Sequence, residues 1–275
     1  MGLRINTNLS ALTARRNLDT ATNQISDSFR KLSSGLRIQR ASDDATGLAV
    51  SERLRAQIRS LEQARRNAGE GISLAQTAEG ALDEISSVLL RLRELSSQAQ
   101  NGTVSSADKQ VLDDEFQSLV SEVDRIAATS EYGGISLLNA SSTVALQVGS
   151  NAATVDSVTI TLQSTTASAL TLDSLDLTIT GTGGPGDAIA AIDAAIDEVT
   201  EYRGSLGAIS SRLTYTIDNL ANSVDNLSAA ESRIRDVDVA EETARLTQAQ
   251  VLQQTALAIL AQANVQPQVA LSLLQ

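Results

Sequence analysis

The sequence predicts a mainly α-helical protein: a long antiparallel helical bundle or coiled coil, a small β-hairpin insert within it, and a pair of helices formed by the two ends of the chain. Three observations support this prediction. Apolar residues recur every seven positions over two long stretches, the period changes to two between them, and only 2% of the 275 residues are aromatic. A core with few aromatic side chains has to be packed from Leu, Ile, Val and Ala, which favours long helices over compact enzyme pockets.

The first predicted helix covers residues 9–36. Its apolar residues recur with helical spacing, and Gly35 near its end is typical of a helix stop. The longest regular pattern follows in residues 43–100, where a seven-residue spacing connects Leu54, Leu61, Ala68, Ala75, Leu82 and Leu89. Residues 42–44, Ser-Asp-Asp, precede it and offer an N-cap hydroxyl and two carboxylates at the positive end of the helix dipole. A metal site is the alternative interpretation of these carboxylates, but no further ligands cluster with them in the sequence.

A third helix is predicted at residues 107–128, after an Asn-Gly stop. Within the following insert, residues 140–186, apolar and polar residues alternate as in half-buried strands, at 144–148, 158–162 and 175–179. The insert contains no Lys or Arg and ends in a glycine-rich connector.

A second long heptad pattern covers residues 188–234. A short helical hairpin cannot use seams of this length, so we expect residues 45–100 and 188–234 to pack lengthwise, with the third helix as another member of the bundle. Three domains follow from this organisation: residues 1–42 with 236–275, residues 43–139 with 187–235, and the insert 140–186.

The two ends of the chain are both amphipathic, and Pro267 is expected to break the C-terminal helix, predicted at 243–264. Residues 1–40 carry a net charge of +5 and residues 236–275 a net charge of −3, so the ends are complementary. A pair of helices has little core of its own and needs neighbours. We therefore expect the ends to fold only on assembly, through contacts of Leu9, Leu12, Ile25, Leu252, Ile259 and Leu260.

Composition argues against an enzyme, a metal centre and a bound cofactor. The chain contains no His, no Cys and no Trp, which removes disulfides, thiol nucleophiles and histidine acid–base chemistry. The only ionisable side chains of the insert are Asp156, Asp173 and Asp176, and we expect them to solvate turns and loops.

Neither nucleic acid nor membrane is expected as a partner. The net charge is −12, whereas nucleic-acid affinity rests on an excess of cations. Residues 1–66 do carry a net charge of +6 against −18 for the rest, but without flanking aromatic residues. No apolar run approaches the roughly 20 residues of a membrane span, and the N-terminus lacks the order of a secretory signal peptide. The protein either stays in the cytoplasm or leaves it by another route.

Motifs near both ends resemble bacterial flagellin. They are Ile5-Asn6-Thr7-Asn8-Leu9-Ser10-Ala11-Leu12, Leu32-Ser33-Ser34-Gly35-Leu36-Arg37-Ile38, Ala41-Ser42-Asp43-Asp44-Ala45-Thr46-Gly47-Leu48-Ala49, and the C-terminal stretch from Leu252-Gln253-Gln254 through Leu260-Ala261-Gln262-Ala263-Asn264 to Leu271-Ser272-Leu273-Leu274. The resemblance covers roughly residues 1–138 and 188–275. Large flagellins have bulky outer domains between these regions, so this chain is similar to a minimal flagellin that lacks them.

The resemblance implies a structural subunit that is exported unfolded by the flagellar type III apparatus and polymerises with itself into a helical filament used for motility. It also implies a flagellin export chaperone, a flagellar cap and hook-junction proteins as partners, and a secreted, extracellular location. In flagellins recognised by the vertebrate Toll-like flagellin receptor, the site resembles Arg91, Leu95 and Glu115 here. Arg91 and Leu95 are one turn apart and are expected to share a helix face; from the residues alone, Arg91 and Glu94 are solvated charges and Leu95 belongs to the seam.

Other functions remain open at this point. The hook-filament junction protein resembles flagellin at both termini, and a periplasmic flagellar core filament protein is a flagellin in another compartment. A cytoplasmic coiled-coil adaptor would explain the heptads but not the two-residue period of the insert. Some flagellins contain an inserted hydrolase domain, but this insert has no cluster of metal ligands.

Overall fold

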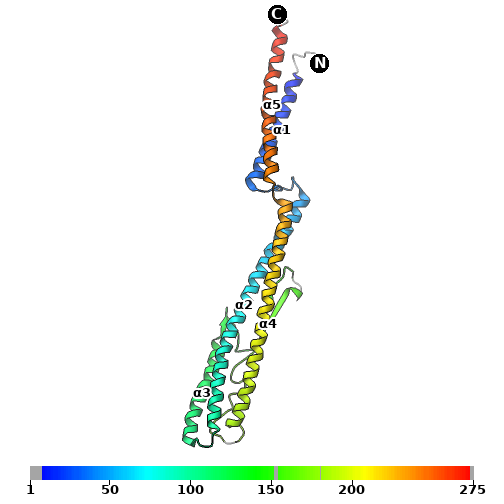
Figure 1. Cartoon of the computed structure of the whole chain (residues 1–275). Helices are drawn as coiled ribbons and strands as arrows, with labels where there is room; N and C mark the ends of the chain where they lie inside the picture. Colours follow the sequence, from blue (N-terminus) through cyan, green and yellow to red (C-terminus); the bar gives the residue numbers. More distant parts are fainter. Residues whose placement is uncertain (1–7, 152–153, 180, 273–275) are drawn as a thin grey trace. The chain divides into compact units, whose positions relative to one another are not determined.

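The computed structural model describes residues 8–151, 154–179 and 181–272 (Figure 1). Its elements are, in chain order, α1 (Leu9–Ser34), α2 (Ala45–Ala99), α3 (Ser106–Thr129), β1 (Glu131–Tyr132), β2 (Ile135–Ser136), β3 (Ser142–Gln147), a 3-10 turn η1 (Thr154–Asp156), β4 (Ser157–Leu162), α4 (Pro185–Arg235) and α5 (Val239–Ser272). The predicted fold class, mainly α with a small β-hairpin, is confirmed.

The chain divides into two compact units, residues 1–56 with 226–275 and residues 57–225. The first unit contains α1, α5 and the adjoining ends of α2 and α4, and the second contains everything between. The three-domain division inferred from the sequence stays a prediction.

In the first unit, α1 and α5 lie side by side and antiparallel (Figure 1). The Asn8 side chain caps the start of α1 by accepting a hydrogen bond from the Ala11 N–H (3.1 Å). Gly35 ends the helix, as predicted, with a φ of 72° that only glycine adopts without strain.

The connectors next to these two helices are joined to each other. Leu36 and Asp236 form an antiparallel bridge, and the Arg37 guanidinium donates to the carbonyl of Ile234 near the end of α4 (2.6 Å). The ends of α1 and α4 are thereby held together within the first unit.

The cap of α2 differs from the prediction by two residues. Asp44, not Ser42, accepts a hydrogen bond from the Gly47 N–H (2.8 Å). The Asp43 carboxylate accepts bonds from the N–H groups of Arg40 and Gln39, and these backbone bonds lower the pKa of Asp43. Both carboxylates therefore serve local turns, and no group of three or more metal-ligating side chains occurs within the described ranges.

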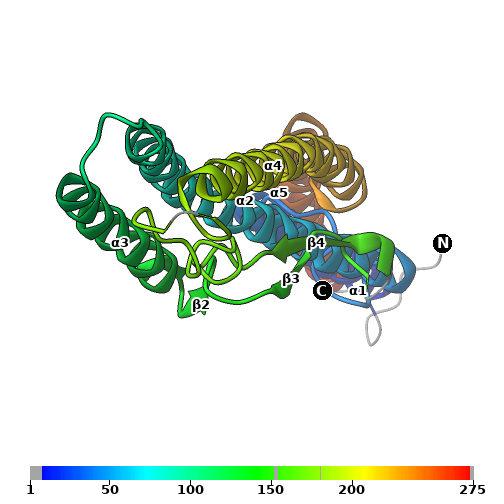
Figure 2. The ribbon, with the colours of Figure 1, turned by 90° about the horizontal axis from the view of Figure 1, so that it is seen from below.

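The second unit has a large apolar core shared by α2, α3 and α4, which surround the segment after β4 (Figure 2). Leu82, Leu89 and Leu206 are at most 1% exposed. Two ion pairs cross between α2 and α4, Arg203 with Asp83 (2.9 Å) and Arg93 with Asp193 (2.5 Å). The lengthwise packing of the two heptad helices is confirmed.

The β-hairpin insert packs on this core. β3 and β4 pair antiparallel, with Val144 opposite Ile160 and Leu146 opposite Val158. Gly71 of α2 leaves room for Leu146, because a Cβ atom there would collide with the leucine side chain. A second, very short hairpin of β1 and β2 was not predicted.

The third predicted strand, at 175–179, is wrong. The segment is irregular, although Leu175 and Leu177 are buried. Its backbone bonds to α3 rather than to a strand: the Leu177 N–H donates to Asp113 (2.9 Å), and the Gln117 amide donates to the Leu175 carbonyl (2.9 Å). These side chains supply the hydrogen bonds that a neighbouring strand would have made.

The predicted helix break at Pro267 is also wrong, because α5 continues to Ser272. A proline inside a helix removes one backbone hydrogen bond and need not end it. Residues 5–7 of the first motif and Leu273-Leu274 of the last lie outside the described residues.

Candidate assembly surface

The seam between α1 and α5 consists of small side chains. The buried residues recur every seven positions on each helix and are at most 6% exposed: Ala14, Ala21 and Ser28 on α1, and Glu242, Ala249, Ala256 and Ala263 on α5. Hydrogen bonds join the helices as well, from the Asn8 amide to the Ala263 carbonyl (2.7 Å) and from Gln253 to Thr22 (3.2 Å). The two helices approach closely but bury little apolar area against each other.

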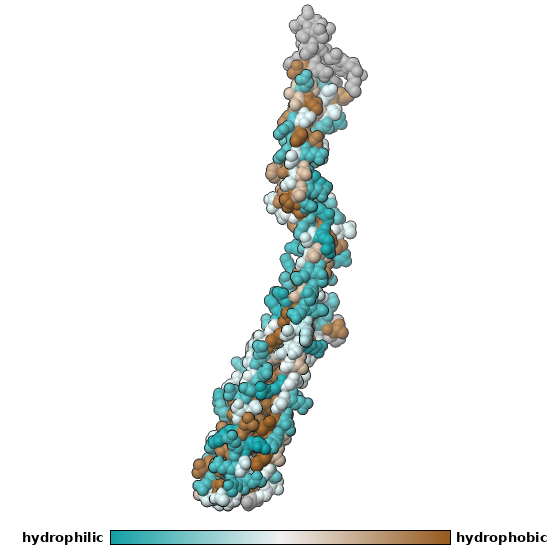
Figure 3. All heavy atoms as spheres, viewed as in Figure 1, coloured by the Kyte–Doolittle hydropathy of each residue, from teal (hydrophilic) through white to brown (hydrophobic). Residues whose placement is uncertain are grey.

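Many large apolar side chains of the same pair are exposed to solvent, and the others, such as Leu18 and Leu246, are half-buried. Those that are 48–62% exposed are Leu9, Leu12, Phe29, Val239, Val251, Leu252, Leu257, Ile259 and Val265. In Figure 3, hydrophobic residues are visible among hydrophilic ones along this pair of helices. Apolar side chains gathered on one exposed element mark a surface that contacts another molecule.

The structure exposes most of the predicted assembly residues. Leu9, Leu12, Leu252 and Ile259 belong to the exposed set, whereas Ile25 and Leu260 are half-buried. Leu9, Leu252 and Ile259 also line a recess along one side of the pair, together with the seam residues Ala14, Ala21 and Ala256. Polar residues such as Asn17 and Gln24 line the rest of the recess.

The sequence did not predict that Phe29 is exposed or that Ser28 and Glu242 form a buried pair. Phe29 precedes the Leu32–Ile38 motif and was counted with the seam, but it is 55% exposed. Ser28 and Glu242 were detectable, because each lies one heptad from the alanines of its own helix.

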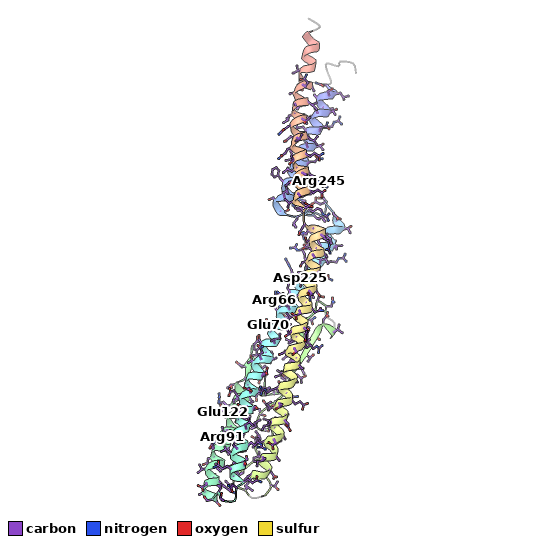
Figure 4. All side chains as sticks on the ribbon, viewed as in Figure 1. Arg66, Glu70, Arg91, Glu122, Asp225 and Arg245 are labelled. Carbon is purple, nitrogen blue, oxygen red and sulfur yellow. The ribbon has the colours of Figure 1, made fainter. Side chains whose placement is uncertain are left out.

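The three residues of the suggested receptor site do not share one surface. Arg91 bonds to Glu115 on α3 (2.8 Å) and to Glu94 (3.0 Å), and these carboxylates raise the pKa of Arg91. Figure 4 locates Arg91 and Glu122 on the neighbouring helices α2 and α3. Leu95, by contrast, is 1% exposed and belongs to the core. Arg91 and Leu95 lie one turn apart on α2, but Leu95 is turned into the apolar core, as the alternative interpretation of Leu95 as a seam residue expects, and the receptor site stays a prediction.

Two of the three aspartates of the insert bond within their own loops. Asp156 accepts from the Asn151 N–H (2.9 Å), and Asp176 from the N–H of Thr178 (2.7 Å). Both bonds match the turn role expected for these residues.

Two family models match the chain over most of its length. The model described as bacterial flagellin N-terminal helical region matches residues 5–143, and the one described as bacterial flagellin C-terminal helical region matches residues 189–274. This chain belongs to the bacterial flagellin family. As a flagellin, it is a structural subunit of the flagellar filament.

Relatives of similar length support the assignment. The flagellin of Halalkalibacterium halodurans is 49% identical over 272 residues, covering 98% of this chain and 99% of its own. The flagellin of Bacillus subtilis is 40% identical, with 99% and 100% covered. The flagellar filament 33 kDa core protein of Treponema phagedenis is 42% identical, with 98% and 99% covered. Within the part of this flagellin that the structure describes, no helix is both long and apolar enough to cross a membrane.

Proposed function

We propose that this flagellin polymerises through the exposed apolar surface of α1 and α5, and that the two helices become ordered only in the filament. One observation carries the proposal: the fully buried apolar residues between the two helices are alanines, whereas the leucines, isoleucines and phenylalanine of the pair are exposed or only half-buried.

The energetic reason is that ordering the backbone of the two helices costs more free energy than the burial of their seam contributes. Fixing the backbone costs roughly 1–2 kcal/mol per residue, whereas burying a methyl-sized group stabilises by about 0.8 kcal/mol. An alanine seam with one buried residue per heptad cannot offset the cost of ordering all seven. Burial of a leucine or isoleucine against a neighbouring copy adds about 1.5–3 kcal/mol each.

Further partners follow from the family rather than from contacts in the structure. A homopolymer of this chain is the main assembly, and its handling requires an export chaperone, the flagellar cap and hook-junction proteins. The proposed location is the extracellular flagellum. We propose no catalytic role for the chain. A periplasmic filament is the second candidate location that the resemblance allows.

Recognition by a Toll-like flagellin receptor is proposed for Arg91 and Glu115, which are both close to half exposed. Leu95 supports this surface from the core, because it lies one turn after Arg91 on the same helix.

Hydrogen exchange on the dilute monomer and on sedimented filaments tests the proposal. We expect fast exchange of the amides in 9–34 and 246–263 in the monomer, protection of the same amides in the filament, and slow exchange within α2 and α4 of the second unit in both states. Removal of residues 1–40 or 240–275 should abolish sedimentation and leave residues 57–225 protected. Slow exchange of α1 and α5 in the dilute monomer would contradict coupled folding.

A further inference from the structure

The α1·α5 seam contains one polar layer among alanine layers. The Ser28 hydroxyl of α1 donates to the Glu242 carboxylate of α5 (2.5 Å). Both side chains are buried, at 6% and 5% exposure. Counting seven residues from this layer in opposite directions leads to Ala21 and Ala249, and then to Ala14 and Ala256.

The alanine layers cannot define which residues face each other. Because they repeat every seven residues on both helices, a shift of one heptad in either direction again places alanine opposite alanine. One shift pairs Ala14 with Ala249, and the other pairs Ala14 with Ala263. Alanine side chains have too little shape for knobs-into-holes packing to prefer one alignment.

The polar layer does distinguish the alignments. The first shift places the Glu242 carboxylate against the methyl group of Ala21, where it has no hydroxyl partner. In the second, Glu242 lies level with Gly35, beyond the end of α1, and Ser28 faces Ala249. A buried carboxylate that loses its partner is strongly disfavoured, and a single buried polar layer is a known means of specifying register in coiled coils.

We infer that Ser28 and Glu242 determine the register in which the two terminal helices of this flagellin pair. They are positioning residues, acting on assembly through the alignment of Leu9 and Leu12 with Leu252 and Ile259. A recess next to the layer is lined by charged residues of both signs, Lys31 and Arg245 together with Asp27. The inference rests on the proposed function, because the pair is ordered in the filament.

The test uses engineered cysteine pairs, since the chain has no cysteine of its own. Ala14→Cys with Ala256→Cys reports the observed register, and Ala14→Cys with Ala249→Cys or with Ala263→Cys reports the two shifted registers. Each double-cysteine chain is co-assembled with an excess of cysteine-free parent, so that cross-links form within one chain. Sedimentation and thiol cross-linking are then measured on the same filaments.

In the parent background we expect the 14–256 cross-link to dominate. Glu242→Ala should raise the ratio of shifted to observed cross-links by about tenfold or more, the factor that loss of one charged hydrogen bond corresponds to. The swapped chain, Ser28→Glu with Glu242→Ser, restores the polar layer with its partners exchanged and should restore the parental ratio. A general effect on stability would not produce this rescue.

The outcomes are distinct. An unchanged ratio in Glu242→Ala filaments would overturn the inference and assign the register to the connectors at residues 35–44 and 236–238. If Glu242→Ala does not assemble, the swapped chain decides: assembly with the 14–256 cross-link supports the inference, and failure overturns it. Failure of the unmodified chain to sediment would instead overturn the proposed function.

Discussion

The two long helix pairings of this flagellin have the same period and opposite packing. Between α2 and α4 most heptad positions hold leucine, isoleucine or valine, with alanine at 68 and 75, and several of those in the second unit, such as Leu82 and Leu213, are fully buried. Between α1 and α5 the buried positions hold alanine, serine and glutamate, and the large apolar side chains are exposed or only half-buried. Heptad spacing therefore predicts that helices pair, whereas residue size at the seam decides whether the pair is stable alone or depends on neighbours.

The largest expected effect is on the exposed surface of α5. Leu252→Ser with Ile259→Ser should abolish sedimentable filaments, because both side chains are about half exposed in the single chain and lose their burial against a neighbouring copy. The thermal midpoint of the monomer should not change. Gln254→Ser, an exposed polar position on the same helix, is the matched control. Filaments at the parental yield in the double variant would contradict the proposed surface.

The second effect compares two leucines. Leu213→Ala should lower the free energy of unfolding by about 2–5 kcal/mol, through lost burial and a cavity, since Leu213 is 0% exposed. Leu257→Ala on α5 should change it by less than about 0.5 kcal/mol, because that side chain is 50% exposed in the single chain. Urea unfolding of both monomers measures the difference. Equal losses would show that α5 is packed in the monomer.

A third comparison separates surface from core within α2. Arg91→Ala should reduce activation of the Toll-like receptor about tenfold, equivalent to about 1.4 kcal/mol, without changing the thermal midpoint. Leu95→Ala should lower the midpoint, because Leu95 is 1% exposed. Lys109→Ala, which removes a partly exposed cation from α3, is the control. An Arg91→Ala chain with full activity would contradict the receptor site.

The smallest effect is electrostatic and depends on pH. The hydrogen bond from Arg93 lowers the pKa of Asp193 from its usual 3.8, so the ionised carboxylate favours the folded state. Its contribution is present above pH 3.8 and is lost as the pH falls through the lowered pKa. Asp193→Asn should therefore unfold at a slightly lower temperature than the parent at neutral pH, and the two should converge in acid. A difference in unfolding temperature between the variant and the parent that stays constant down to about pH 2 would contradict this role of Asp193.

The sequence predicted those features that depend on periodicity. The spacing from Leu82 to Leu89 and the recurrence of Leu206 and Leu213 were sufficient to identify two helices and their buried faces. Alternation was less informative, because Leu175 and Leu177 alternate with polar residues in a segment that is not a strand. In that segment the Asp113 carboxylate accepts a backbone hydrogen bond that a neighbouring strand would otherwise accept, and Asp113 lies more than 60 residues earlier in the chain.

The candidate surface was only partly predictable for a similar reason. Apolar identity placed Leu9 and Leu252 on the amphipathic helices, but exposure depends on which face the partner helix covers. The face that the partner helix covers is indicated by the seven-residue spacing of the alanines, Ala14 and Ala21 on one helix and Ala249 and Ala256 on the other. The resemblance to receptor-binding flagellins brought Leu95 into a surface site, and its heptad phase would have kept it in the core.

The ion pair between Asp83 and Arg203 has a kinetic consequence. It joins residues 120 positions apart, so the core between α2 and α4 cannot close until the first part of α4, up to Arg203, has been synthesised. At roughly 5–20 residues per second, the ribosome needs on the order of ten seconds to make the intervening chain. During that time α2 and α3 lack one wall of their core, and pairings with so large a sequence separation also form slowly. The nascent chain therefore leaves the apolar faces of α2 and α3 uncovered by α4 throughout that interval.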